Sequence, residues 1–151
     1  GGNGRDILYG GIGSDEIHGD FGWNTYRSEI DGFIDLIAIK SDQFLSNWWY
    51  GKSGNSPNGE KADMLEGLDH FDQLKILGVN TSALTFKENA ESHGEIGLGI
   101  YAHGVLEALY TGDNLSLSEL KELTFGDNSD MAMNNKIWSY WNSNDVPDLL
   151  I

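Results

Sequence analysis

Asp6 and Asp15 occupy the same position in two consecutive nine-residue units at the start of the chain. Residues 1–9 read GGNGRDILY and residues 10–18 read GGIGSDEIH, with glycine at positions one, two and four, aspartate at six and an apolar residue at eight. Glycine permits the positive φ of a tight turn and leaves backbone carbonyls unshielded. Those carbonyls and the carboxylate together supply the all-oxygen shell that Ca²⁺ prefers. The pattern therefore predicts calcium-binding turns.

A third, less regular unit follows in residues 19–27, GDFGWNTYR, with Asn24 at position six. Its neutral amide oxygen should bind a cation more weakly than a carboxylate. Positions six to nine predict a short strand in each unit, with Leu8, Ile17 and Tyr26 pointing inward. A flexible glycine-rich linker would not keep acids and large apolar residues in phase. Because each turn lacks a core of its own, we expect successive turns to stack.

This pattern resembles the RTX, or hemolysin-type calcium-binding, nonapeptide repeats. The resemblance implies a parallel β-roll in which Ca²⁺ lies between turns, and it makes Asp6, Asp15 and Asn24 ligating side chains. It also implies that the first unit pairs with the third and that the second needs a later partner. The backbone carbonyls that would complete the shells lie around Gly2, Asn3, Gly4, Gly11, Ile12 and Gly13.

Further acids follow the repeats. Asp31 and Asp35 flank the start of a predicted buried strand at residues 33–39. They form either a last calcium shell that partners the second unit or a solvated strand edge. Residues 58–66 keep glycine at position two, Asp63 at six and an apolar residue at eight, so Asp63 is a secondary calcium-ligand candidate.

Asp69 and Asp72 precede a predicted strand that Gly78 ends, and a calcium role for them stays open. Residues 41–61 have the composition of an insertion loop. They contain Trp48, Trp49 and Tyr50, whose flat rings either contact sugars or pack over the open end of the roll.

Residues 62–151 predict a β-rich C-terminal capping region. Thr85 to Tyr110 predicts three short strands with turns at 91–94 and 103–104, and residues 116–123 predict one short helix opened by a capping box. The last four residues, Asp-Leu-Leu-Ile, resemble the C-terminal export signal of type I secreted proteins. The sequence thus predicts a mainly β fold: β-roll repeats in residues 1–40, the insertion, and the cap.

The amino-acid composition excludes several classes of function. The 151 residues carry 9 Lys and Arg against 24 Asp and Glu, a formal charge of −15, which repels nucleic acid and anionic lipid and attracts cations. No cysteine is present, and no apolar run approaches the roughly 18 residues of a membrane span. The four histidines lack metalloenzyme spacing and no nucleophile elbow occurs, so we expect no enzyme.

The sequence therefore predicts an extracellular calcium-binding module that folds on binding Ca²⁺. We expect it to be a piece of a larger secreted protein, since the chain begins with glycine and no signal segment. Two alternatives stay open: a structural subunit of a cell-surface layer or filament, and a carbohydrate-binding accessory module.

Overall fold

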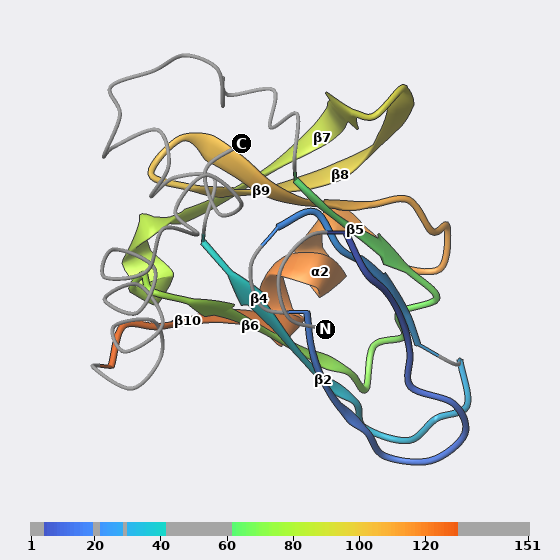
Figure 1. Cartoon of the computed structure of the whole chain (residues 1–151). Coiled ribbons are helices and arrows are strands. Elements are labelled where there is room, and N and C mark those ends of the chain that lie inside the picture. Colours follow the sequence, from blue (N-terminus) through green and yellow to red (C-terminus); the bar gives the residue numbers. More distant parts are fainter. Residues whose placement is uncertain (1–4, 20–21, 29, 42–61, 130–151) are drawn as a thin grey trace.

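The protein is described by a computed structural model at residues 5–19, 22–28, 30–41 and 62–129, where two β-sheets enclose a short helix (Figure 1). The strands are β1 (Ile7–Tyr9), β2 (Glu16–His18), β3 (Thr25–Arg27), β4 (Leu36–Lys40), β5 (Asp63–Glu66), β6 (Gln73–Leu77), β7 (Leu84–Ser92), β8 (Glu95–Ala102), β9 (Val105–Tyr110) and β10 (Thr124–Asp127). The helices are a 3₁₀ turn, η2 (Thr81–Ala83), and α2 (Leu117–Leu123).

Successive strands from β1 to β6 alternate between the two sheets. One sheet has the order β1-β3-β5-β9-β8-β7 and the other β10-β6-β4-β2, and all neighbours among the first six strands are parallel. We call β1 with β2, β3 with β4, and β5 with β6 the first, second and third layers. The first unit pairs with the third, as expected, and the later partner of the second unit is β4.

The period-2 prediction for the repeat strands is confirmed. Ile17 and Tyr26 are buried in the core between the sheets, and Leu8 packs against it. Ile37 and Leu65 from the later layers lie in the same cluster and are fully buried. Each strand of a layer thus adds a side chain to one shared core, so the layers depend on their neighbours for stability.

The predicted strand at residues 33–39 is wrong at its beginning. Strand β4 starts at Leu36, and Phe33 and Ile34 lie in the preceding turn with 54% of their surface exposed. The turn of the second layer is longer than that of the first, because Gly10 lies five residues before Asp15 whereas Ser28 lies seven before Asp35. The apolar character of Phe33 and Ile34 suggested a buried strand and did not reveal the two extra residues of this turn.

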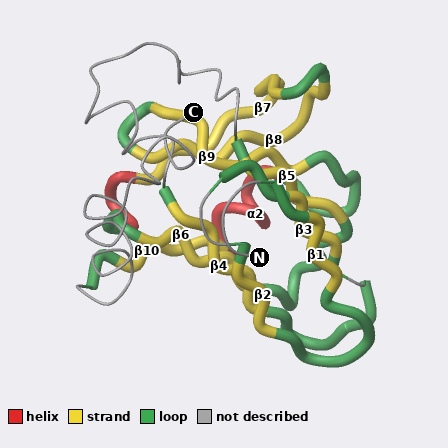
Figure 2. Tube along the Cα trace, in the orientation of Figure 1, coloured by secondary structure: helices red, strands yellow, loops and turns green. Residues whose placement is uncertain are grey.

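The C-terminal part extends both sheets. Strands β7, β8 and β9 form the predicted antiparallel meander, with turns at His93-Gly94 and His103-Gly104 that all have positive φ. The predicted helix is α2, and its capping box is confirmed by Ser116 and Glu119. Strand β10, which was not predicted, adds parallel to β6 (Figure 2). No helix in the described part of the chain is long and apolar enough to cross a membrane.

Candidate metal site in the repeat turns

Acidic or amide side chains stand at the beginning of each of the first six strands and form two rows. The row before β1, β3 and β5 consists of Asp6, Asn24 and Asp63, of which Asp63 is the first residue of β5. The row before β2, β4 and β6 consists of Asp15, Asp35 and Asp72. Parallel stacking places equivalent residues of successive layers beside one another. Sequence-predicted residues far apart in the chain therefore come together along each row.

Backbone N–H groups join the members of the first row. The Asp6 N–H donates to Asn24 Oδ1 at 3.1 Å, and the Asn24 N–H donates to Asp63 Oδ1 at 2.8 Å. Each side-chain oxygen thus satisfies an N–H of the layer before it. Asn24 and Asp63 are buried, so these bonds form away from water, where an unmade bond would cost most.

The second row repeats this arrangement. The Asp15 N–H donates to Asp35 Oδ1 at 2.8 Å, and the Asp35 N–H donates to Asp72 Oδ1 at 3.0 Å. Two acids within the turns add parallel links: the Gly13 N–H donates to Asp31 Oδ2 at 2.8 Å, and Gly32 does the same to Asp69. The turns of the three layers are therefore fastened together by carboxylates.

The second carboxylate oxygen distinguishes the layers. Asp35 Oδ2 accepts a hydrogen bond from the Ser28 hydroxyl, and Asp72 Oδ2 accepts the Asp69 N–H at 2.9 Å. Asp63 Oδ2 lies 3.4 Å from the Tyr26 hydroxyl. Asp35 and Asp72 thus find a donor within the protein for both of their oxygens, and Asp63 has a hydroxyl near its second oxygen.

Asp6 and Asp15 differ, because their Oδ2 atoms are buried and have no hydrogen-bond partner in the described part of the chain. A buried polar atom without a partner costs about 1–3 kcal/mol, and more when it is charged. A hard cation is a suitable partner for such an oxygen. These two orphaned oxygens belong to the two regular nonapeptides, so the residues present fit a calcium ion.

The backbone of the first-layer turn also suits a cation shell. Gly11 and Gly13 have φ of 87° and 106°, a conformation that favours glycine, and Ile12 between them is 86% exposed. The chain thus turns sharply at an exposed residue between two partly exposed glycines. Gly2, Asn3 and Gly4, to which the RTX resemblance assigns the same role in the first unit, lie outside the described residues.

Hydrogen bonding and burial shift two pKa values in these turns in opposite directions. Backbone N–H groups of Gly13 and Phe33 lower the pKa of Asp31. Burial raises the pKa of Asp72 to about 6, and the charges of Asp69 and Asp35 act in the same direction. The ionised carboxylate of Asp72 is therefore less favourable in the folded protein than in water.

Side chains alone do not complete a metal shell here. Within the described ranges, no group of three or more His, Cys, Asp or Glu side chains is placed to hold a metal ion. A cation bound by Asp6 or Asp15 would therefore need backbone carbonyl oxygens, which calcium accepts readily. Trp48, Trp49 and Tyr50, the candidate ligand contacts, lie outside the described residues.

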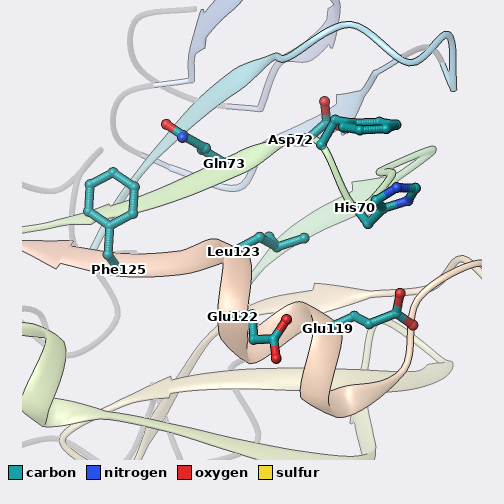
Figure 3. A pocket seen from close by; sticks show the side chains of 8 residues that line it. His70, Asp72, Gln73, Glu119, Glu122, Leu123 and Phe125 are labelled. Atoms are coloured by element: carbon teal, nitrogen blue, oxygen red, sulfur yellow. The ribbon is translucent and has the colours of Figure 1, made fainter.

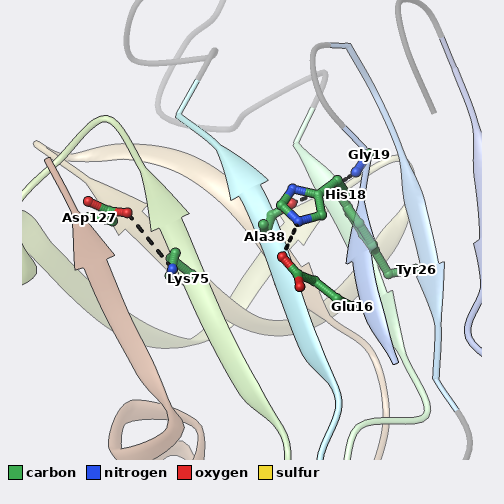
Figure 4. Close-up of polar contacts among 7 residues, drawn as sticks. All are labelled: Glu16, His18, Gly19, Tyr26, Ala38, Lys75 and Asp127. Carbon is green, nitrogen blue, oxygen red and sulfur yellow. Dashed lines mark hydrogen bonds and ion pairs between the residues drawn. The ribbon is translucent and has the colours of Figure 1, made fainter. Parts of the chain in front are cut away.

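Two further features carry titratable side chains: a histidine beside a glutamate, and a hollow next to Asp72. Figure 4 shows His18 beside Glu16, with 2.7 Å between Nε2 and Oε1, on the outer face of the four-stranded sheet. A hollow of about 450 Å³ lies between the turn before β6 and α2, and includes His70, Glu119 and Phe125 (Figure 3). Glu119 accepts the Ser116 N–H at 3.0 Å and caps the helix, so we assign it no chemistry.

Sequence reasoning missed Ser28 and Tyr26 as partners of the acids. Both carry a usable signal. Ser28 stands at position one, where the three preceding units have glycine, and Tyr26 stands at position eight, where the first two units have aliphatic residues. A hydroxyl at a position that otherwise lacks one indicates a new hydrogen bond.

Comparison of this chain with protein-family models, with curated proteins and with solved structures finds no match in any of the three.

Proposed function

We propose that this chain is an RTX-type calcium-binding β-roll module that folds on binding Ca²⁺ and serves as the C-terminal cap of a larger secreted protein. The observation that carries the proposal is the pair of buried, unpartnered oxygens, Asp6 Oδ2 and Asp15 Oδ2. Both belong to the aspartate at position six of a regular nonapeptide, the position at which the RTX resemblance implies a ligand.

The arrangement of the strands supports the β-roll. Strands β1 to β6 alternate between two sheets and pair in parallel, and Ile7 lies beside Thr25, two nine-residue units later. A roll with one nonapeptide per half-turn requires this spacing. The two sheets enclose one apolar core to which each layer contributes.

Charge supports the coupling of folding to calcium. A net charge of −15 opposes the compact state when no cation is bound. An ion that binds only the folded state stabilises it by RT ln(1 + [L]/Kd). Calcium sites of extracellular modules have Kd values of about 10⁻⁴–10⁻³ M, so such a module would fold outside the cell and stay open in the cytosol.

The C-terminal tail is the basis for proposing secretion. This part of the proposal rests on the resemblance of the last four residues to a type I export signal, and those residues lie outside the described ranges. The physical logic is that a chain kept open by low calcium leaves its tail accessible to the secretion machinery. Calcium-driven folding after export would then make the passage one-way.

The test is calcium titration of the chelator-treated chain, followed by calorimetry and circular dichroism, with magnesium as the competing ion. We expect a heat of binding and a gain of β signal with calcium. Magnesium should be much weaker, because it demands a stricter octahedral shell and dehydrates reluctantly. Glu88→Gln, which removes an exposed charge on β7, is the control and should bind calcium normally. No heat and an unchanged spectrum would refute the proposal.

A self-associating structural subunit is the second candidate. It is favoured by exposed large apolar side chains in the turns of all three layers: Ile12, Ile30, Phe33, Ile34 and Phe71. Large exposed apolar groups in one region often mark contact surfaces. Light scattering with and without calcium separates the candidates, because only the subunit should gain mass.

A further inference from the structure

The turn that leads to β2 and the turn that leads to β4 occupy equivalent places in the first and second layers, but the contacts of their aspartates differ. Tyr9 pairs with Arg27, so Gly10 in the first layer corresponds to Ser28 in the second. Glu16 pairs with Leu36, so Asp15 corresponds to Asp35. The two turns can therefore be compared residue by residue.

In the second layer the carboxylate is satisfied by the protein itself. The Ser28 hydroxyl donates to Asp35 Oδ2, while Oδ1 accepts the Asp15 N–H at 2.8 Å. Asp35 is fully buried and Ser28 is buried as well. Both oxygens of this carboxylate are thus paired without any ion.

In the first layer the corresponding donor is missing. Gly10 has no side chain, and a Cβ built there would lie 3.1 Å from Asp15 Oδ2 and 3.0 Å from Ile17 Cδ1. Gly10 is not among the glycines with positive φ, so its backbone conformation does not require glycine. Gly10 therefore offers no donor to Asp15 Oδ2, which is buried and has no hydrogen-bond partner among the described residues.

We propose that the residue at this position decides whether a turn uses a cation. The Ser28 hydroxyl supplies to Asp35 the partner that calcium supplies to Asp15, where Gly10 leaves the oxygen open. The inference rests on the proposed function and sharpens it: the need for calcium resides in the first layer, and the second layer closes without it.

The row before β1, β3 and β5 contains a weaker version of the same replacement. Tyr26 places its hydroxyl 3.4 Å from Asp63 Oδ2 and 3.3 Å from the carbonyl of Ala38, and accepts the Gly19 N–H (Figure 4). Its counterpart in β1 is Leu8, and by the same register the place of the acid is taken by Asn24, so this contact does not bear on Asp6. The hydroxyl can donate to only one of its two acceptors at a time, so Ser28 is the clearer case.

The decisive variant is Gly10→Ser, which transfers the second-layer arrangement to the first. We expect it to bind about one fewer calcium ion per chain, or to bind that ion at least about tenfold more weakly, in calorimetry. Without calcium it should unfold at a higher urea concentration than the unaltered chain. Gly10→Ala fills the same space without a donor, and should not raise the urea midpoint.

The reciprocal variant is Ser28→Gly. Removing the hydroxyl leaves Asp35 Oδ2 buried without a donor, so the calcium-free chain should unfold at a lower urea concentration. Calcium should restore the midpoint, and calorimetry should detect about one additional ion. This variant also keeps the test open if Gly10→Ser fails to fold because of the contact with Ile17.

The outcomes separate this inference from the function on which it rests. If the unaltered chain binds no calcium, both are overturned. If it binds calcium and both Gly10→Ser and Ser28→Gly bind the same number of ions with unchanged affinity, only this inference is overturned. Equal calcium-free urea midpoints for Gly10→Ser and Gly10→Ala would also contradict it, since the hydroxyl would then donate nothing.

Discussion

The parallel layers formed by strands β1 to β6 and the antiparallel strands β7, β8 and β9 are held together by different means. In the layers, short strands expose one side, and the turns are joined through buried acids such as Asp35. In the meander, β9 is buried along its whole length, and its contacts are mainly apolar. A buried polar group destabilises the fold when its hydrogen-bond partner is missing, whereas apolar side chains need no specific partner atom. The layers should therefore respond to cations, and the meander should not.

The two regions share one apolar core and are hydrogen-bonded where β5 pairs with β9. An aromatic stack adds to this contact. The ring of Trp23, in the second layer, lies parallel to the ring of His93 in the β7–β8 turn, with 3.7 Å between centroids. Arg5 also contacts the Trp23 ring, with its Cζ atom 4.1 Å from the ring centroid. His93 Nε2 is 3.1 Å from the carbonyl of Ala62. Order in the layers can thus reach the meander through the shared core, the β5–β9 pairing and this stack.

The largest expected effect is the removal of calcium from the whole chain. We expect amide hydrogens of β1 and β2 to exchange rapidly in chelator, while those of β8 and β9 stay protected. Among the described residues, the buried carboxylate oxygens without a hydrogen-bond partner belong to Asp6 and Asp15, in the first layer. Hydrogen exchange followed by mass spectrometry, with and without calcium, measures this directly. Equal protection of the two regions in chelator would remove the distinction between them.

A substitution in the meander should produce the opposite pattern. A Cβ at Gly97 would lie 2.1 Å from the backbone oxygen of Tyr110, so Gly97→Ala forces β8 and β9 apart. We expect a loss of roughly 1–3 kcal/mol in the free energy of unfolding, with calcium affinity unchanged. The exposed neighbour Ile96→Ala is the control and should change neither quantity. A matching fall in calcium affinity would show that the regions are tightly coupled.

A smaller effect is expected within the rows of acids. Asp15→Ala should weaken calcium binding more than Asp63→Ala, because Asp15 Oδ2 has no partner and Asp63 Oδ2 lies near the Tyr26 hydroxyl. The difference should be about tenfold or more in the calcium dissociation constant, which corresponds to about 1.4 kcal/mol. Titration calorimetry on both variants decides it, and equal or reversed losses would contradict this ranking.

Local patterns in the sequence were sufficient to locate most of the strands and the helix. The phase of glycine and of Leu8, Ile17 and Tyr26 located the first three strands, and the capping box at Ser116 located α2. Strand β10 had no such signal, since its four residues are held by β6 and by the Gly78 N–H, which donates to Asp127 O at 2.8 Å.

The candidate site was accessible from the sequence only in part. The period of the repeat identified Asp6 and Asp15, because their role depends on position within a unit. Ser28 meets Asp35 across an interval of 7 residues, and Tyr26 meets Asp63 across an interval of 37 residues. Such contacts follow from the stacking register, which no local pattern contains.

The smallest expected effect concerns pH and separates the buried end of the second row from the rest of the chain. The pKa of Asp72 is raised from 3.8 to about 6 because the carboxyl is buried, with the charges of Asp69 and Asp35 adding to the shift. The folded state therefore holds a proton that the unfolded state releases at lower pH. By linkage, the stability of the calcium-free chain should fall as pH rises from about 4 to about 6 and then level off.

Acids with lowered pKa values act in a different window. Asp31 and Asp127 stabilise the folded state above their ordinary pKa, and this contribution is lost only as pH falls below about 4. The urea midpoint in chelator, measured from pH 4.5 to 7.5, therefore reports mainly on Asp72. Asp72→Asn keeps one acceptor for the N–H groups of Asp35 and Asp69 but cannot ionise. It should lower the midpoint overall and flatten its slope in this range, whereas a slope equal to that of the unaltered chain would show that the pH response arises from the general acidic charge and not from the buried row.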